Sequence, residues 1–178
     1  MPRLKRPALN LGLSIALILI FSSLVSAVSL RTFENPQLKY SVKYPADFQL
    51  KTLGRTIVFI LPDIDKKTGF AENINITVGS LNPPVLGLDE FFGKAKENLT
   101  MGGSGVKILE EKKDKLGGVD AYRIIYTSKQ KKTDFKLLQV ICIYKNEAYV
   151  VTYTALPEQF SRNLSQANLI IKSLRFTD

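Results

Sequence analysis

The stretch Phe135–Tyr144, FKLLQVICIY, decides the fold because it is apolar on both faces of an extended strand. Successive side chains of a strand point to opposite faces, so the apolar residues separate into two alternating sets. One set contains Phe135, Leu137, Ile141 and Ile143, and the other contains Leu138, Val140 and Cys142. A strand that is apolar on both faces has to be covered on both faces.

Three more strands are predicted around this stretch. Residues 106–115 and 121–127 flank Gly117-Gly118, a turn that accepts positive φ angles. Residues 128–133 are polar and rich in lysine, which predicts a turn. Residues 148–154 follow a short turn and form the next strand, with Val150 and Val151 on opposite faces. Sequential strands joined by short turns form an antiparallel meander.

Strand-like segments also precede the meander. Tyr40–Tyr44 and Asn73–Val78 alternate apolar and polar residues with period two, as half-buried strands do. Thr56–Leu61 is rich in β-branched residues, and Pro62 is expected to end it.

Two segments show the apolar spacing of helices. The first stripe consists of Leu88, Phe91, Phe92, Ala95 and Leu99, and the second of Phe160, Leu164, Ala167, Ile171 and Leu174. Pro157 and Glu158 suit the first turn of the second helix. We therefore expect a single α+β domain: an antiparallel sheet of about six to seven strands with helices on both faces, an α/β/α sandwich.

The order of these segments and several local strings resemble the PsbP family, the extrinsic proteins of photosystem II and their prokaryotic relatives. The strings are Tyr40–Phe48, Gly117–Tyr122, Ala148–Ala155, Phe160 and Ile171–Phe176. The resemblance implies a PsbP-like domain over residues 33–178. A nuclear Ran-binding factor and bacterial periplasmic lipoproteins share that fold, so the fold alone does not define a function.

The resemblance implies a non-catalytic accessory protein that docks on a membrane complex and stabilises the complex or its ions. Family members that bind metal commonly use a histidine, and this sequence contains none. We therefore expect no metal and no cofactor.

The N-terminus has the basic, apolar and then small-residue pattern that is typical of a secretory signal peptide. Val25 and Ala27 lie where signal peptidase accepts small side chains, so we expect residues 1–27 to be removed after Ala27. The alternative is an uncleaved anchor over residues 9–30, which is long enough to cross a bilayer about 30 Å thick. Both interpretations predict an extracytoplasmic domain, secreted, periplasmic or anchored to the outer face of the membrane.

The charge balance limits the class of partner. The whole chain has a formal net charge of +9, and removing residues 1–27 leaves 22 basic and 16 acidic residues, a charge of +6. Such a moderately basic domain is attracted to acidic protein surfaces and anionic membranes. It lacks the strong basic signature of a nucleic-acid-binding protein.

The sequence has no catalytic signature. Without histidine there is no histidine-based triad or zinc site, and the single Cys142 excludes an intramolecular disulfide. Cys142 lies in the most apolar strand, so we expect a buried, inert thiol. Glu110-Glu111 lies beside two lysines and is interpreted as a solvated hairpin. We expect no enzyme activity.

Two loops resemble ligand-binding motifs only in part. Asp63–Gly69 begins like a calcium loop, but Lys67 stands at the fifth position and Ile74 at the twelfth, so a polar turn is predicted. Gly102–Gly105 lacks the lysine of a phosphate-binding loop and is interpreted as a connector.

The candidate docking surface consists of lysines in two turns. Lys129, Lys131 and Lys132 crowd one predicted turn, and Lys66 and Lys67 lie in another. If the turns lie close together, they could dock an acidic membrane complex or anionic lipid head groups. The alternative is that these lysines only keep exposed turns soluble.

Three glycosylation sequons, at Asn75, Asn98 and Asn163, are short motifs that often match by chance.

The leading hypothesis for function is an exported, non-catalytic accessory or binding protein. The alternative is a small-ligand or metal-ion binding module, and a carboxylate-based hydrolase is the weakest candidate.

Overall fold

The structure is a computed structural model that describes residues 28–81, 87–101 and 105–178. Its elements are β1 (Leu30–Asn35), β2 (Tyr40–Pro45), β3 (Gln49–Leu53), β4 (Thr56–Ile64), β5 (Ala71–Ser80), α1 (Leu88–Met101), β6 (Lys107–Leu116), β7 (Val119–Gln130), β8 (Thr133–Tyr144), β9 (Glu147–Ala155), α2 (Phe160–Ser173) and β10 (Arg175–Phe176). The predicted signal peptide, with Ala27, lies outside the described residues, as does most of the predicted glycine connector. Within the described ranges, no helix is long and apolar enough to cross a membrane.

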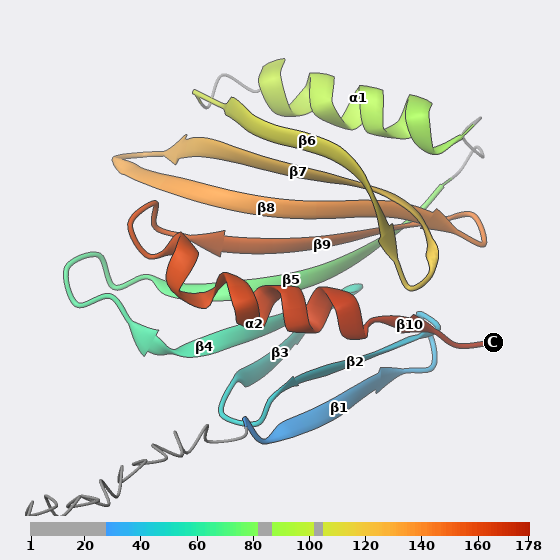
Figure 1. Ribbon diagram of the computed structural model, residues 1–178, viewed down its shortest axis with the longest axis horizontal. Coiled ribbons are helices and arrows are strands. Elements are labelled where there is room, and N and C mark those ends of the chain that lie inside the picture. The colour runs from blue at the N-terminus through green and yellow to red at the C-terminus, as the bar shows by residue number, and fades with distance from the viewer. Residues whose placement is uncertain (1–27, 82–86, 102–104) are drawn as a thin grey trace, which may run out of the picture.

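Seven strands form one antiparallel sheet in the order β3-β4-β5-β9-β8-β7-β6 (Figure 1). Strands β6 to β9 are consecutive neighbours in this sheet, which confirms the predicted meander. Gly117 and Gly118 connect β6 to β7 with φ angles of 59 and 91°. Strand β9 joins the meander to β5, so the two halves of the sheet meet at β9.

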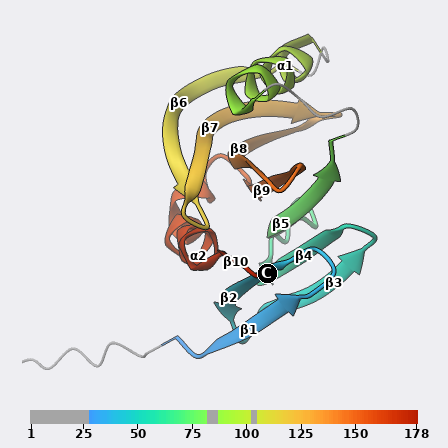
Figure 2. The same ribbon diagram turned by 90° about the vertical axis from the view of Figure 1, so that its right-hand side faces the viewer.

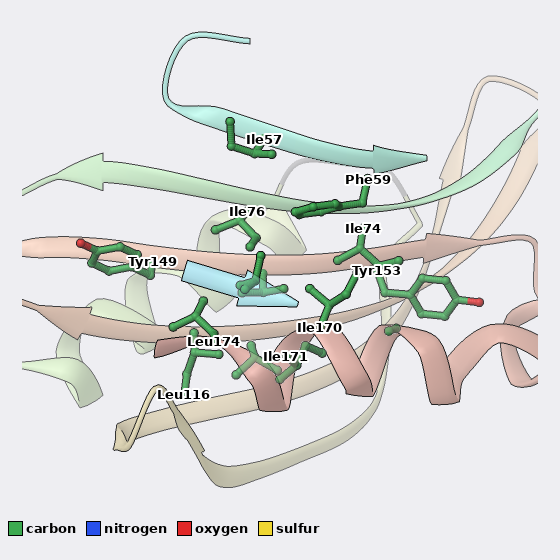
Figure 3. Close-up of a cluster of buried hydrophobic side chains, with 14 of the residues drawn as sticks. Ile57, Phe59, Ile74, Ile76, Leu116, Tyr149, Tyr153, Ile170, Ile171 and Leu174 are labelled. Atoms are coloured by element: carbon green, nitrogen blue, oxygen red, sulfur yellow. The ribbon is translucent and has the colours of Figure 1, made fainter. Parts of the chain in front are cut away.

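Strand β8 separates two hydrophobic cores, and its alternating residues divide between them as the sequence predicts. The larger core combines Leu138, Val140 and Cys142 with Phe160, Ala167, Ile170 and Ile171 of α2. The smaller core combines Phe135, Leu137 and Ile141 with Phe92 of α1. Figure 3 shows the larger core, where isoleucines of β4 and β5 gather with those of α2.

A second sheet, in the order β1-β2-β10, corrects the expectation of a single sheet. The predicted strand at Tyr40–Tyr44 is its central strand, β2, and lies beside β3 and β4 in Figure 2 without belonging to their sheet. A period-two pattern shows that one face of a strand is buried but does not name its hydrogen-bond partner. The partners, β1 and β10, are largely exposed and carry no apolar alternation.

The helices provide only part of the predicted cover. Helix α2 shares the larger core with Tyr40, Val42 and Tyr44 of β2, so the small sheet covers part of that core. Helix α1 buries a single residue, Phe92. The fold is therefore an α+β sandwich that is mostly β, and not a sheet with a complete helical layer on each face.

Three predicted boundaries are wrong. Strand β4 continues through Pro62 to Ile64, because its register shifts between Ile60 and Ile64 and such an irregularity tolerates proline. The turn predicted over residues 128–133 is shorter, since Gln130 pairs with Thr133. Pro157 precedes α2, which begins at Phe160.

Candidate functional site

The lysines of the candidate docking surface lie at one end of the seven-stranded sheet. Lys66 and Lys67 lie in the β4–β5 turn, and Lys129, Lys131 and Lys132 lie at the β7–β8 turn. Strand β9 ends at this same end of the sheet, where Thr154 pairs with Asn73 of β5 and Ala155 pairs with Lys136 of β8. Figure 1 shows both turns on the left of the sheet.

An aromatic contact connects the two turns. Phe70 follows the first turn and Phe135 follows the second, and their ring centroids are 4.9 Å apart in an edge-on arrangement. The rings therefore hold together two segments that are far apart in the sequence. The structure brings the two predicted lysine groups to the same end of the sheet.

All five lysines are exposed, and none forms an ion pair with another described residue. Their positive charges are therefore not neutralised by ion pairs within the described residues. Acidic groups also lie nearby, because Asp134 is paired in register with Lys129. The surface is thus basic at its turn tips, with carboxylates behind them.

Asp65 holds the β4–β5 turn in shape. Its Oδ1 accepts hydrogen bonds from the backbone N–H groups of Lys67 and Thr68, at 3.1 and 2.8 Å, and from the Thr68 hydroxyl at 2.8 Å. Its Oδ2 accepts one from Gln159 at 2.9 Å, which ties the turn to the start of α2. The hydrogen bonds from Thr68 lower the pKa of Asp65.

The loop that resembles a calcium site is therefore a polar turn whose carboxylate is already occupied. In the described part of the chain, no group of three acidic, histidine or cysteine side chains is placed to hold a metal ion.

A cavity of about 270 Å³ lies behind the first lysine turn. Its lining consists of Asp63, Ile64, Asp65, Lys66, Glu72, Gln159, Arg162 and Asn163. Glu72 is only 4% exposed, and its Oε2 accepts a hydrogen bond from the Tyr153 hydroxyl at 2.5 Å. Burial and this hydrogen bond raise the pKa of Tyr153.

Glu72 is not among the predicted site residues, although the sequence contains a signal for it. Glu72 continues the alternation of Ile74, Ile76 and Val78, the buried residues of β5. A carboxylate in phase with an apolar stripe is expected to face the core, where acidic residues are rare unless paired. The predicted strand begins at Asn73 and therefore does not include Glu72.

A larger cavity, of about 540 Å³, lies between the start of α1 and the β6–β7 hairpin. Its four carboxylates already have partners. Asp89 accepts a hydrogen bond from Tyr122, and Glu90, Asp114 and Asp120 form ion pairs with Lys94, Arg123 and Lys115. These partners neutralise much of the acidic charge of this cavity.

Among the remaining candidate residues, the burial of Cys142 is as the sequence predicts. Cys142 is fully buried, and burial raises the pKa of its thiol to about 12, so it is not a nucleophile at neutral pH. Glu110 and Glu111 lie inside strand β6, not at a hairpin turn, and form ion pairs with Lys112 and Lys96. Of the sequon residues, Asn98 is exposed, and Asn75 and Asn163 are half-buried.

The fold can be compared with proteins of known structure. No family model matches the sequence, and no curated protein matches it. Solved structures do match, at low sequence identity.

Cyanobacterial PsbP (CyanoP) from Synechocystis sp. PCC 6803 matches with a TM-score of 0.60 and 12% identity, over 85% of this chain and 95% of that one. LpqN, involved in cell envelope biogenesis of Mycobacterium tuberculosis, matches with a TM-score of 0.61 and 13% identity, over 84% of this chain and 91% of that one. A mutant of the protein Mog1 matches with a TM-score of 0.58 and 12% identity, over 84% of this chain and 97% of that one. These similarities concern the fold alone, and they show that this chain has a PsbP-like fold.

Proposed function

We propose that this protein is a non-catalytic, extracytoplasmic accessory module that docks on an acidic surface of a membrane-associated protein complex. The observation that carries the proposal is the position of the two lysine turns. Lys66 and Lys67 lie at the same end of the sheet as Lys129, Lys131 and Lys132, and the Phe70–Phe135 contact connects the two turns.

The physical basis is electrostatic complementarity. Several exposed cations on short turns attract an acidic partner over a distance of about 8–10 Å at physiological salt. Such an arrangement accelerates association and selects against basic partners. Because the turns already fix the backbone, the conformational entropy lost on binding is mainly that of the lysine side chains.

The location outside the cytoplasm is supported by the N-terminal pattern of basic, apolar and small residues. The match to LpqN agrees with this location, since that protein is involved in cell envelope biogenesis. An accessory role agrees with the absence of a catalytic signature in the sequence.

The test is in-cell crosslinking of the tagged full-length protein, followed by mass spectrometry of the co-purified proteins. Two variants carry the reversed charge: Lys129, Lys131 and Lys132 changed together to Glu, and Lys66 and Lys67 changed to Glu. The control changes Lys43, Lys51 and Lys113 to Glu, because these lysines are exposed but lie away from the two turns.

We expect a defined membrane complex to co-purify with the wild-type protein and with the control, and to be lost from both turn variants. Equal loss in the control would show that net charge alone matters, and would overturn the proposed surface. Retention of the complex in both turn variants would overturn the proposal as well.

A small-ligand module is the second candidate, and the 540 Å³ cavity favours it. This volume falls within the range of about 300–1,000 Å³ that is typical of small-molecule sites. A ligand that binds there would raise the melting temperature, and the rise would grow with the logarithm of its concentration above Kd, so a thermal-shift screen tests this candidate directly.

A further inference from the structure

Glu72 is the one charged residue that is buried in the described part of the chain. It continues the apolar stripe of β5 into the larger core, and 4% of its surface is exposed. Taking a carboxylate out of water is unfavourable unless a cation or several hydrogen bonds compensate it.

No described lysine or arginine forms an ion pair with Glu72. Its single side-chain hydrogen bond comes from Tyr153, to Oε2, at 2.5 Å. No described residue donates to Oε1. Asp114 differs, because Arg123 donates a hydrogen bond to it and forms an ion pair with it.

The Tyr153 hydroxyl has one hydrogen but two acceptors within reach. Glu72 Oε2 lies at 2.5 Å and the carbonyl oxygen of Phe160 at 3.1 Å. The shorter distance and the charge of the carboxylate favour donation to Glu72. Tyr153 thereby fixes one carboxylate oxygen and leaves the other available.

Glu72 lines the 270 Å³ cavity behind the first lysine turn, together with Asp63. Asp63 is exposed and makes no ion pair with a described residue. Ile64 also lines the cavity and is 62% exposed, so it offers apolar surface to an aliphatic stem. Lys66 and Arg162 also line the cavity and are exposed, and they can pair with acidic groups beside an entering side chain.

We propose that this cavity is a subsite for one basic side chain of the partner, whose ammonium or guanidinium group binds the carboxylate of Glu72. The proposal rests on the docking function above and adds the chemistry of the partner: an acidic surface that presents a single lysine or arginine. Acidic residues of the partner bind the lysine turns, and the basic residue fills the cavity between β4, β5 and the start of α2.

The first test needs no variant of the protein. Two short peptides are titrated into the full-length protein by isothermal titration calorimetry, an acetylated and amidated Glu-Lys-Glu and the same peptide with norleucine in place of lysine. Norleucine keeps the aliphatic stem and lacks the ammonium group. We expect the lysine peptide to bind at least tenfold more tightly, and equal heats at millimolar peptide would overturn the subsite.

The second test changes Glu72→Gln, which keeps an acceptor for Tyr153 and removes the charge. We expect binding of the lysine peptide to weaken at least tenfold and that of the norleucine peptide to be unchanged. Glu97→Gln is the control, since Glu97 is exposed on α1. Unchanged binding of the lysine peptide by Glu72→Gln would overturn the proposal.

Crosslinking in cells distinguishes failure of the subsite from failure of the docking function. If the lysine-turn variants lose the complex and Glu72→Gln keeps it in full, the docking function stands and the subsite is wrong. If the lysine-turn variants keep the complex, the docking function itself is wrong, and the peptide titrations decide the subsite alone.

Discussion

The rings of Tyr40 and Tyr149 lie edge-on in the larger core with centroids 6.2 Å apart, yet only one of the two hydroxyls has a partner. Tyr149 donates a hydrogen bond to the carbonyl oxygen of Leu38 at 2.9 Å. The Tyr40 hydroxyl is buried and has no partner among the described residues. Burial raises the pKa of both phenols, that of Tyr149 to about 12.

Replacing Tyr40 with Phe is therefore expected to stabilise the protein. The substitution removes a buried, unsatisfied hydroxyl, whose desolvation costs about 1–3 kcal/mol, and keeps the ring. Urea denaturation should show an equal or higher free energy of unfolding.

Tyr149→Phe serves as the comparison. It removes a hydrogen bond and leaves a carbonyl oxygen unpaired, so we expect a loss of about 1–2 kcal/mol. A loss of similar size from Tyr40→Phe would show that its hydroxyl has a partner after all.

Gly117 should be the least replaceable glycine of the hairpin turns. A Cβ at this position would lie 2.6 Å from Cε2 and 2.7 Å from Cδ2 of Phe176, and the φ angle is +59°. Gly54 has the same φ angle of +59° but no atom within 4 Å of its Cβ position.

We expect Gly54→Ala to cost about 1 kcal/mol, from backbone strain alone. Gly117→Ala should cost about 3 kcal/mol, since overpacking is added to the same strain. Thermal denaturation of both variants measures the difference. Equal melting temperatures would mean that Phe176 moves aside without cost.

Cys142 should resist thiol reagents in the folded protein. Its pKa of about 12 leaves almost no thiolate at neutral pH, and its side chain is fully buried. We expect no reaction with an aromatic disulfide reagent in buffer and complete reaction in urea. Fast labelling of the native protein would instead indicate local opening around β8.

Asp114 should make stability depend on pH. Burial alone would raise its pKa, but hydrogen bonds from Arg123 and the backbone of Lys115, together with the charges of Arg123 and Lys112, outweigh burial and lower the pKa below its ordinary value of 3.8. The ionised form therefore stabilises the fold above about pH 4, and this contribution is lost as the pH falls through the folded-state pKa.

We expect Asp114→Asn to lower the free energy of unfolding by about 1 kcal/mol at pH 7, and the difference from wild type to shrink in acid. The control is Asp120→Asn, because the hydrogen bond from Lys115 also lowers the pKa of Asp120 but solvent screens that pair. A constant difference between wild type and Asp114→Asn at all pH values would contradict the assignment.

The parts of the fold that the sequence predicts best are those with the strongest apolar pattern. The alternation in Phe135–Tyr144 predicts both the position of β8 and the division of its residues between two cores. The burial of Cys142 is predicted by the same pattern. In this strand the pattern of buried residues agrees with the alternation that strand geometry requires, so the local sequence is sufficient to predict the structure.

The short outer strands could not be predicted in the same way. β1 and β10 bury little of their surface, and hydrogen bonds to β2 define them as strands. Backbone pairing leaves no periodic signature in side chains that face water. The same reasoning explains why the sequence failed to place β2 in a second sheet.

The candidate site shows a similar division. The polar residues of the two turns predict that Lys66 and Lys131 are exposed. Their common location follows from the strand order, which brings the β4–β5 and β7–β8 turns to one end of the sheet. Glu72 is visible in the sequence only as an exception to a pattern. Its contact with Tyr153 joins residues on two strands, and no local spacing encodes that contact.

The position of β2 between β1 and β10 has a consequence for how the protein is made. Ser41 pairs with Arg175 and Tyr40 with Phe176. Strand β2 is therefore synthesised long before β10, a strand that pairs with it. Loop closure over such a sequence separation is slow. The small sheet is therefore completed only after Phe176 has left the ribosome, and until then the backbone groups on one side of β2 have no strand to pair with.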